Sequence, residues 1–85
     1  KSRSVKGDNL REGDVADALG ALATEFPDVS IGSYPYFLEV KAGEIKRGTH
    51  LVARATDTGQ LDQVIARIAV MVEAVGITPR IDPVD

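Results

Sequence analysis

The sequence predicts an α+β domain with a ferredoxin-like β-α-β-β-α-β fold, a two-layer split sandwich with two helices on one face of an antiparallel sheet. The prediction rests on two amphipathic helical segments, two alternating segments between them, and weaker strand candidates near both ends. In chain order these are strand 3–7, helix 14–26, strands 29–34 and 50–56, helix 58–75 and strand 78–81. Right-handed crossovers place both helices on one side, and the second strand then lies at a sheet edge.

The first helix, residues 14–26, is predicted from a single apolar stripe. The stripe has helical spacing and consists of Val15, Ala18, Leu19, Leu22, Ala23 and Phe26. Glu12 and Asp14 suit the positive end of the helix dipole. Pro27 ends the helix because proline cannot continue its hydrogen bonding.

The second helix, residues 58–75, carries the most complete set of signals. Asp57 is a good N-cap, and Gln60 three residues later completes a capping-box pattern. One stripe follows, formed by Leu61, Val64, Ile65, Ile68, Val72 and Val75. Gly76 stands where a left-handed residue commonly ends a helix, so the helix is predicted to end at Val75.

The central strands are predicted from alternation. In residues 50–56, Leu51, Ala53 and Ala55 face the helices, while the remaining side chains, His50, Val52, Arg54 and Thr56, face the other way. Pro35 is expected to end the edge strand that contains Val29 and Ile31, because proline cannot donate to a ladder. Residues 35–48 are too apolar for a free loop and form either an extended hairpin or a flap over the open face of the sheet.

Composition limits the classes of protein to which the chain can belong. Its 85 residues suffice for one domain, and 44% hydrophobic residues indicate a folded one. No apolar run approaches the ~20 residues of a membrane span, and the absence of cysteine fits a reducing cytoplasm. The net charge of -3 and scattered basic residues argue against nucleic-acid binding; the nearest cluster, Lys41, Lys46 and Arg47, is interpreted as a solvated loop.

Both ends of the chain have the composition of linkers. Residues 1–4 and 82–85 are polar or proline-containing, and the chain begins at Lys1 without an initiator methionine. Residues 1–85 are therefore expected to be a single domain cut from a larger protein.

No residues suggest catalysis or metal binding. His50 is the single histidine and has no neighbouring serine, so it is interpreted as a surface or strand-end residue. One histidine and no cysteine make a zinc site improbable. Asp8, Glu12 and Asp14 are interpreted as a loop and a helix start, and no glycine-rich phosphate-binding loop is present. No catalytic residue, metal ligand or cofactor site is predicted.

The most distinctive segment is an aromatic cluster that follows a glycine, Gly32-Ser33-Tyr34-Pro35-Tyr36-Phe37. A glycine inside a strand suggests a bulge or a close backbone approach. Exposed aromatic clusters often mark contact surfaces, so these six residues are candidate binding or interface residues. The alternative is that the aromatic rings pack over the end of the sheet and support the following loop.

Gly32-Ser33-Tyr34-Pro35, preceded by Phe26–Ile31, resembles a segment that follows the molybdopterin-binding domain in bacterial CinA-type competence/damage-inducible proteins. It is also similar to the middle region of eukaryotic FAD synthases. Leu51–Arg54 with Thr56-Asp57 and the Glu12–Asp14 helix start fit the same pattern. The resemblance implies an accessory domain, with pterin or nucleotide chemistry in the preceding domain, and it carries over residues 32–35 and Arg54.

Three functions remain open. The expected one is a non-catalytic accessory domain that packs against, or dimerises, a MoaB-like molybdopterin-binding domain of the same cytoplasmic protein. Molybdopterin or a nucleotide would be bound by the parent protein, and a homodimer is a further option. The alternative is a ferredoxin-like regulatory domain that senses a small ligand. RNA binding by the sheet is disfavoured by the net charge.

Overall fold

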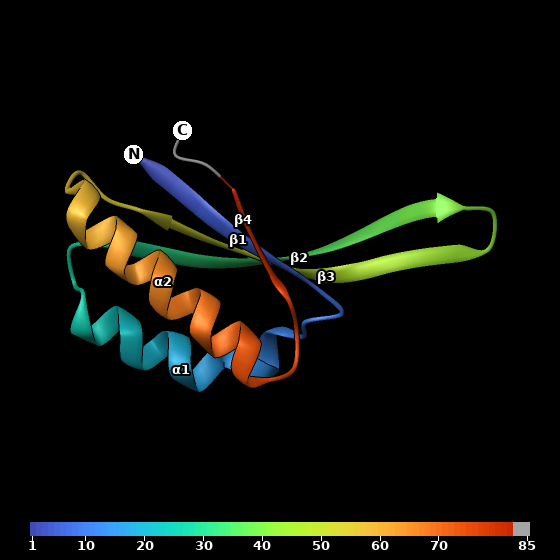
Figure 1. The fold of residues 1–85 in the computed structure, drawn as a ribbon, viewed down its shortest axis with the longest axis horizontal. Helices are drawn as coiled ribbons and strands as arrows, with labels where there is room; N and C mark the ends of the chain where they lie inside the picture. Colours follow the sequence, from blue (N-terminus) through green and yellow to red (C-terminus); the bar gives the residue numbers. More distant parts are fainter. Residues whose placement is uncertain (83–85) are drawn as a thin grey trace.

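The computed structural model describes residues 1–82, and it has the predicted ferredoxin-like architecture (Figure 1). Its elements are β1 (Ser2–Asp8), α1 (Glu12–Glu25), β2 (Ser30–Lys41), β3 (Glu44–Arg54), α2 (Thr58–Ala74) and β4 (Pro79–Asp82). The strand order is β2-β3-β1-β4, so the second strand is an edge as predicted. Ser2–Ser4 and Asp82 belong to strands, which corrects their interpretation as linkers; 83–85 lie outside the described residues.

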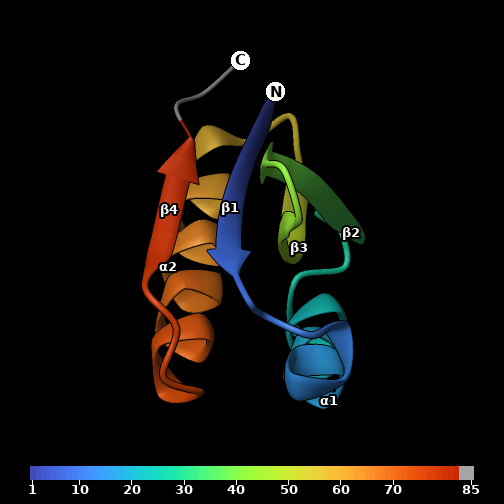
Figure 2. The same cartoon turned by 90° about the vertical axis from the view of Figure 1, so that its right-hand side faces the viewer.

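The sheet is antiparallel throughout, and both helices cover one of its faces (Figure 2). β1 lies in the centre, with Val5 opposite Leu51 of β3 on one side and Ile81 of β4 on the other. Both of the weaker strand candidates near the ends of the chain are therefore confirmed as strands of the sheet. The opposite face of the sheet carries no helix and is called the open face below.

The core lies between the sheet and the two helices. Val5, Leu51 and Ala53 are fully buried, which confirms the predicted helix-facing side of β3. Six residues of α2 are also buried: Leu61, Val64, Ile65, Ile68, Ala69 and Val72. α2 therefore contributes most of the helical side of the core.

α1 is packed less deeply than its apolar stripe suggested. Only Val15 and Leu22 of this helix are buried, while Ala18 and Ala23 are exposed. Alanine side chains are too short to reach the sheet from a helix at its margin. The helix also begins at Glu12 and ends at Glu25, with Phe26 as its C-cap rather than its last residue.

The ends of α2 match the sequence signals. The Asp57 carboxylate accepts hydrogen bonds from the backbone N–H groups of Gly59 and Gln60, at 2.8 and 3.1 Å. Gly76 has a φ of 83°, the left-handed conformation expected after a helix. The helix ends at Ala74, one residue earlier than predicted.

β2 and β3 are much longer than expected and form an extended hairpin. The strand does not end at Pro35, which lies inside the ladder opposite Thr49. Pro35 is tolerated because β2 is an edge strand, where the N–H that proline lacks would point outward to solvent and not into the ladder. Of the two alternatives for residues 35–48, the extended hairpin is confirmed.

The hairpin gives the molecule an elongated shape. β1 ends where Asp8 pairs with Gly48, and Gly48 pairs with Tyr36 on its other side. Residues 37–47 therefore form a two-stranded ribbon, and this segment is called the hairpin arm. It projects past the helices (Figure 1), and the Cα extents are 43 × 26 × 16 Å. No helix among the described residues is long and apolar enough to cross a membrane.

Candidate functional site

The alternation of β2 distributes the aromatic segment over both faces of the sheet. Ser33 pairs with buried Leu51, so residues 33, 35 and 37 point to the helix side. Gly32 pairs with Val52 and Tyr34 with His50, so residues 32, 34 and 36 belong to the open face. The six predicted interface residues therefore contribute to two surfaces and not to one.

The hairpin arm exposes large apolar side chains. Phe37, Leu38 and Ile45 are 67%, 53% and 60% exposed. Phe37 and Ile45 lie on the helix-side face of the ribbon and Leu38 on the other. The Arg47 guanidinium carbon lies 5.7 Å from the centroid of the Phe37 ring, within the range of a cation–π contact. Arg47 and its neighbours thus belong to a strand, and not to a solvated loop.

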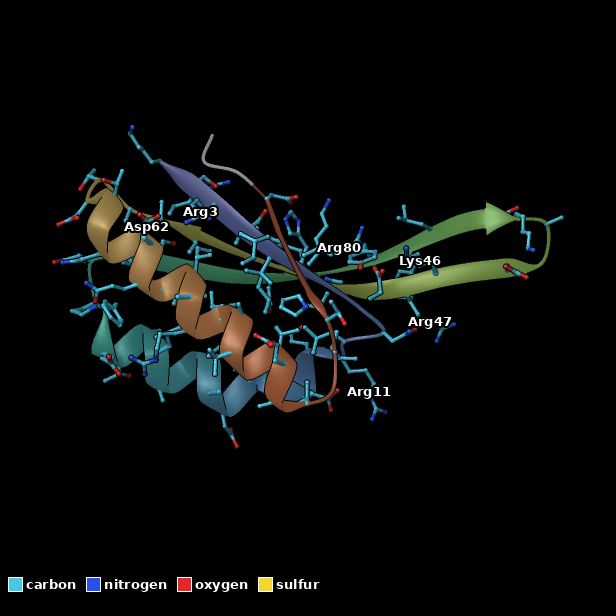
Figure 3. The ribbon with its side chains drawn as sticks, in the orientation of Figure 1. Arg3, Arg11, Lys46, Arg47, Asp62 and Arg80 are labelled. Atoms are coloured by element: carbon cyan, nitrogen blue, oxygen red, sulfur yellow. The ribbon has the colours of Figure 1, made fainter. Side chains whose placement is uncertain are left out.

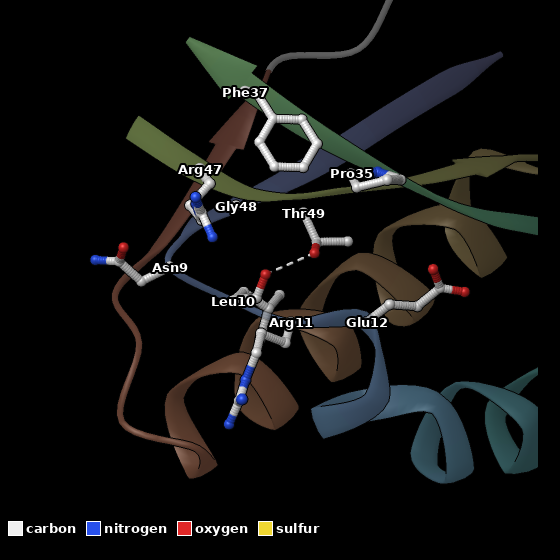
Figure 4. A pocket seen from close by; sticks show the side chains of 9 residues that line it. All are labelled: Asn9, Leu10, Arg11, Glu12, Pro35, Phe37, Arg47, Gly48 and Thr49. Atoms are coloured by element: carbon white, nitrogen blue, oxygen red, sulfur yellow. Dashed lines mark hydrogen bonds between the residues drawn. The ribbon is translucent and has the colours of Figure 1, made fainter. Parts of the chain in front are cut away.

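A cleft of about 350 Å³ lies at the base of the arm, between the arm and the start of α1 (Figure 4). Its walls include Leu10, Pro35 and Phe37. The buried Thr49 hydroxyl donates a 2.7 Å hydrogen bond to the Leu10 carbonyl and fixes the turn that forms one wall. The cleft is therefore a preformed, mainly apolar feature.

On the open face, Asp8 is the centre of a hydrogen-bonded network. Its carboxylate accepts a hydrogen bond from the Tyr36 hydroxyl and lies 2.8 Å from Arg80 Nη2 and 3.1 Å from Lys46 Nζ. Figure 3 shows that Lys46 and Arg80 come from different strands. The Tyr36 hydrogen bond, followed by the two cations, lowers the pKa of Asp8. Burial, followed by the hydrogen bond to Asp8, raises the pKa of Tyr36.

Gly48 provides the space for this network. A Cβ atom at Gly48 would lie 2.5 Å from the Tyr36 hydroxyl and would overlap the Gly7 carbonyl oxygen. The Tyr36 ring therefore crosses directly over Gly48 on its way to Asp8. A side chain at position 48 would displace either the ring or the backbone of β1.

A second network surrounds Asp82. The buried Ser4 hydroxyl donates a 2.9 Å hydrogen bond to the Asp82 carboxylate, and Lys6 Nζ and His50 Nε2 lie 3.9 and 3.8 Å from it. His50 is in the middle of β3, so its interpretation as a strand-end residue was wrong. Burial, followed by the Lys6 charge, lowers the pKa of His50.

Tyr34 lies back along its own strand. A Cβ atom at Gly32 would be 2.9 Å from the Tyr34 hydroxyl and 3.0 Å from its Cε2, so the ring covers the glycine. The close approach is therefore made by a side chain and not by another backbone segment, and the ladder is regular at Gly32, so neither expectation for this glycine is met. Tyr34 and Arg54 line the same small cleft of about 90 Å³.

The candidate interface residues predicted from the sequence thus lie on different surfaces of the molecule. Tyr34 and Arg54 share the open face, whereas Phe37 belongs to the helix-side face of the arm. Sequence reasoning missed Asp8 and Asp82, because their partners are far away in the chain. Among residues 1–82, no three histidine, cysteine or carboxylate side chains gather into a metal site.

Comparison with known proteins gives one family. Residues 8–80 match the family described as the middle domain of FAD synthase. None of the curated proteins compared matches the chain. Similar solved structures include the de novo designed protein Ferredog-Diesel (16% identity, 98% of this chain, 85% of that chain, TM-score 0.48) and the periplasmic divalent cation tolerance protein CutA from Archaeoglobus fulgidus (11% identity, 100% and 85%, TM-score 0.48).

Proposed function

The chain belongs to the FAD synthase middle-domain family, and from this premise we propose that it is a non-catalytic accessory domain that binds a neighbouring domain through the hairpin arm. The proposed partner is a MoaB-like molybdopterin-binding domain of the same protein, as in the bacterial CinA-type proteins that the sequence resembles. Any molybdopterin or nucleotide would then be bound by that partner domain.

The arm is the observation that carries the proposal. An isolated two-stranded ribbon is marginally stable in water, and this one exposes apolar side chains on both faces. A partner that covers Phe37, Leu38 and Ile45 would stabilise the ribbon and remove apolar surface from water. The same hydrophobic contact would position two domains relative to each other.

Contact through the faces of the arm is favoured over pairing along its edge. Pro35 interrupts the outer edge of β2, and the ladder has an irregularity between Glu39 and Lys41. Both features discourage the addition of another strand. The partner is therefore expected to pack on side chains and not to extend the sheet.

The test is an NMR titration of the ¹⁵N-labelled chain with the molybdopterin-binding-like domain. We expect chemical-shift changes at Tyr34–Phe37, Leu38 and Ile45. The double variant Leu38→Ser/Ile45→Ser should weaken binding by about tenfold or more, because two apolar contacts are lost. Val70→Ser removes an equally exposed apolar side chain from α2 and should leave binding unchanged.

The proposed interface would be refuted if the arm showed no chemical-shift changes. It would also be refuted if the α2 control, Val70→Ser, weakened binding as much as the arm double variant does. Analytical ultracentrifugation of the chain alone addresses the homodimer. The chain has a mass of 9.1 kDa. A dimer of twice this mass, which becomes monomeric in the arm double variant, would identify a second copy as the partner.

The cleft at the base of the arm supports the second candidate, a domain that senses a small ligand. Its volume of about 350 Å³ lies within the range of ligand pockets. Thermal unfolding with flavin, ADP-ribose, pterin and amino acids distinguishes the two. A rise in melting temperature with one ligand class, abolished by Thr49→Val at the cleft wall, would favour sensing over domain docking.

A further inference from the structure

The open face has a charge opposite to that of the whole molecule. Apart from the Lys41–Glu44 ion pair at the tip of the arm, its cations are Lys6, Lys46, Arg54 and Arg80, and its carboxylates are Asp8 and Asp82. Four cations against two carboxylates leave the face positive, although the chain has a net charge of -3. The sheet therefore gathers basic residues that are scattered in the sequence and presents them on one surface.

Arg54 differs from the other cations on this face. Lys6, Lys46 and Arg80 each lie within 3.9 Å of Asp8 or Asp82. Arg54 is exposed and has no carboxylate within ion-pair distance among the residues that the structure describes. Its guanidinium group, with five N–H donors, is free to bind an anion.

An aromatic ring stands beside this free cation. Tyr34 is 57% exposed, and its ring folds back over Gly32 toward the end of the sheet that carries Arg54. Ser30, which pairs with Arg54, adds a hydroxyl group, and Val52 forms the floor. The missing side chain of Gly32 thus allows one flat ring and one unpaired cation to line the same cleft of about 90 Å³.

We propose that this cleft, between Tyr34 and Arg54 on the open face, holds the anionic group of a small ligand whose flat ring lies outside the cleft, against Tyr34. Arg54 contacts the anion through paired N–H groups, and Ser30 contributes a further hydrogen bond. The ligand's ring stacks on Tyr34 at the exposed side of the cleft. Nearby, Lys6 and Arg80 pair with Asp82 and Asp8, so no unpaired carboxylate of these strands repels the anion.

A small ligand fits this surface better than a nucleic-acid strand. Strand binding requires several cations that replace counterions along a phosphate backbone. Here Lys6, Lys46 and Arg80 are engaged with carboxylates, so Arg54 is the cation available for a new partner. The net charge of -3 also repels a long polyanion at distance, whereas one anionic group needs only the local contact.

The test uses adenosine monophosphate as a probe, titrated into the ¹⁵N-labelled chain. Shift changes are expected at residues 30–34 and 52–54. Adenosine lacks the anion and ribose 5-phosphate lacks the ring. Each should therefore bind at least about tenfold more weakly than adenosine monophosphate. Equal binding of adenosine, or shifts confined to the arm cleft, would overturn the proposal.

Two variants and one control localise the site. Arg54→Gln should weaken binding by about tenfold, the typical effect of removing one charge-assisted contact. Gly32→Ala should do the same while the fold is retained, because the added methyl group displaces only the end of the Tyr34 ring. Arg67→Gln removes an exposed cation from α2 and should change nothing.

If the Arg54→Gln or Gly32→Ala variant binds adenosine monophosphate as tightly as the parent chain does, the proposed binding site is refuted. A short oligonucleotide that binds far more tightly than the monophosphate, with a steep salt dependence, would also overturn it in favour of strand binding. Neither outcome depends on the hairpin arm, so the domain-docking proposal is tested separately.

Discussion

The clearest structural prediction concerns Gly48, where Gly48→Ala should destabilise the fold. The new Cβ atom would lie 2.5 Å from the Tyr36 hydroxyl and 2.6 Å from its Cζ, and it would overlap the Gly7 carbonyl oxygen. The tyrosine can rotate away, but it then loses its hydrogen bond to Asp8. The Gly7 carbonyl belongs to the central strand and cannot move without disturbing the β1–β3 ladder.

The cost follows from these two contributions. Overpacking against backbone costs about 1–3 kcal/mol, and the loss of a charge-assisted hydrogen bond adds about 1–2 kcal/mol. We expect a loss of about 2–5 kcal/mol in the free energy of unfolding. For a domain of this size, each kcal/mol corresponds to about 4–8 °C, so the melting temperature should fall by about 8–40 °C.

Urea unfolding followed by circular dichroism measures this change, with Gly20→Ala as the matched control. Gly20 lies in α1, and a Cβ atom there has no neighbour within 4 Å. The control should gain about 0.5–1 kcal/mol from helix propensity. In a Tyr36→Ala background, the cost of Gly48→Ala should shrink without vanishing. If Gly48→Ala unfolds within 0.5 kcal/mol of the parent chain, about the limit of a surface substitution, the close packing described here is refuted.

Three further predictions concern hydrogen bonds and ionisation. Asp57→Ala should cost about 1 kcal/mol in urea unfolding, because it removes the side-chain cap of α2. Tyr36→Phe should raise the pKa of Asp8 toward its usual value, because the hydrogen bond from Tyr36 is the main cause that lowers it. A lowered folded pKa stabilises the fold above the unfolded pKa, so Tyr36→Phe should cost about 1–2 kcal/mol at pH 7. This cost should fade as the solution is acidified through the folded pKa of Asp8. Burial, followed by the Lys6 charge, lowers the pKa of His50, so its NMR titration midpoint should lie below the usual value of about 6.5. In the Lys6→Gln variant the midpoint should move closer to this usual value. A midpoint at or above the usual value in the parent chain would contradict this prediction.

The helices and the sheet order followed from local patterns because these patterns are imposed by the core. α2 could be delimited within one residue because its buried stripe, the Asp57 cap and Gly76 all agree. The prediction of α1 was less accurate, because an apolar stripe that contains Ala18 does not distinguish a buried helix face from one at the exposed margin of the core.

The long hairpin could not be derived from the same patterns. Pro35 marks the end of most strands, and only the edge position of β2 allows the ladder to continue past it. The arm also lacks the inside–outside alternation that identifies strands, because neither of its faces covers a core. Apolar residues such as Leu38 and Ile45 therefore indicated burial when they are in fact exposed.

The polar networks depended on strand register, which the sequence does not display. Asp8 meets residues that are 28 and 72 positions away in the chain, so local spacing identified it only as a turn residue. Net charge likewise does not display how charges are distributed over the surface. The sheet brings Arg54 and Arg80 to one face while most acidic residues remain elsewhere, so a negative chain presents a positive surface.

The aromatic segment is better understood as two sites on one strand. Its even-numbered members, Tyr34 and Tyr36, lie over glycines on the open face, where Gly32 and Gly48 leave room for their rings. Phe37 faces the opposite way and is exposed on the arm. A change at Gly32 should therefore affect ligand binding and leave domain docking intact, whereas a change at Phe37 should do the reverse. Two surfaces that respond separately to neighbouring substitutions would explain why one short segment combines glycine, proline and three aromatic residues.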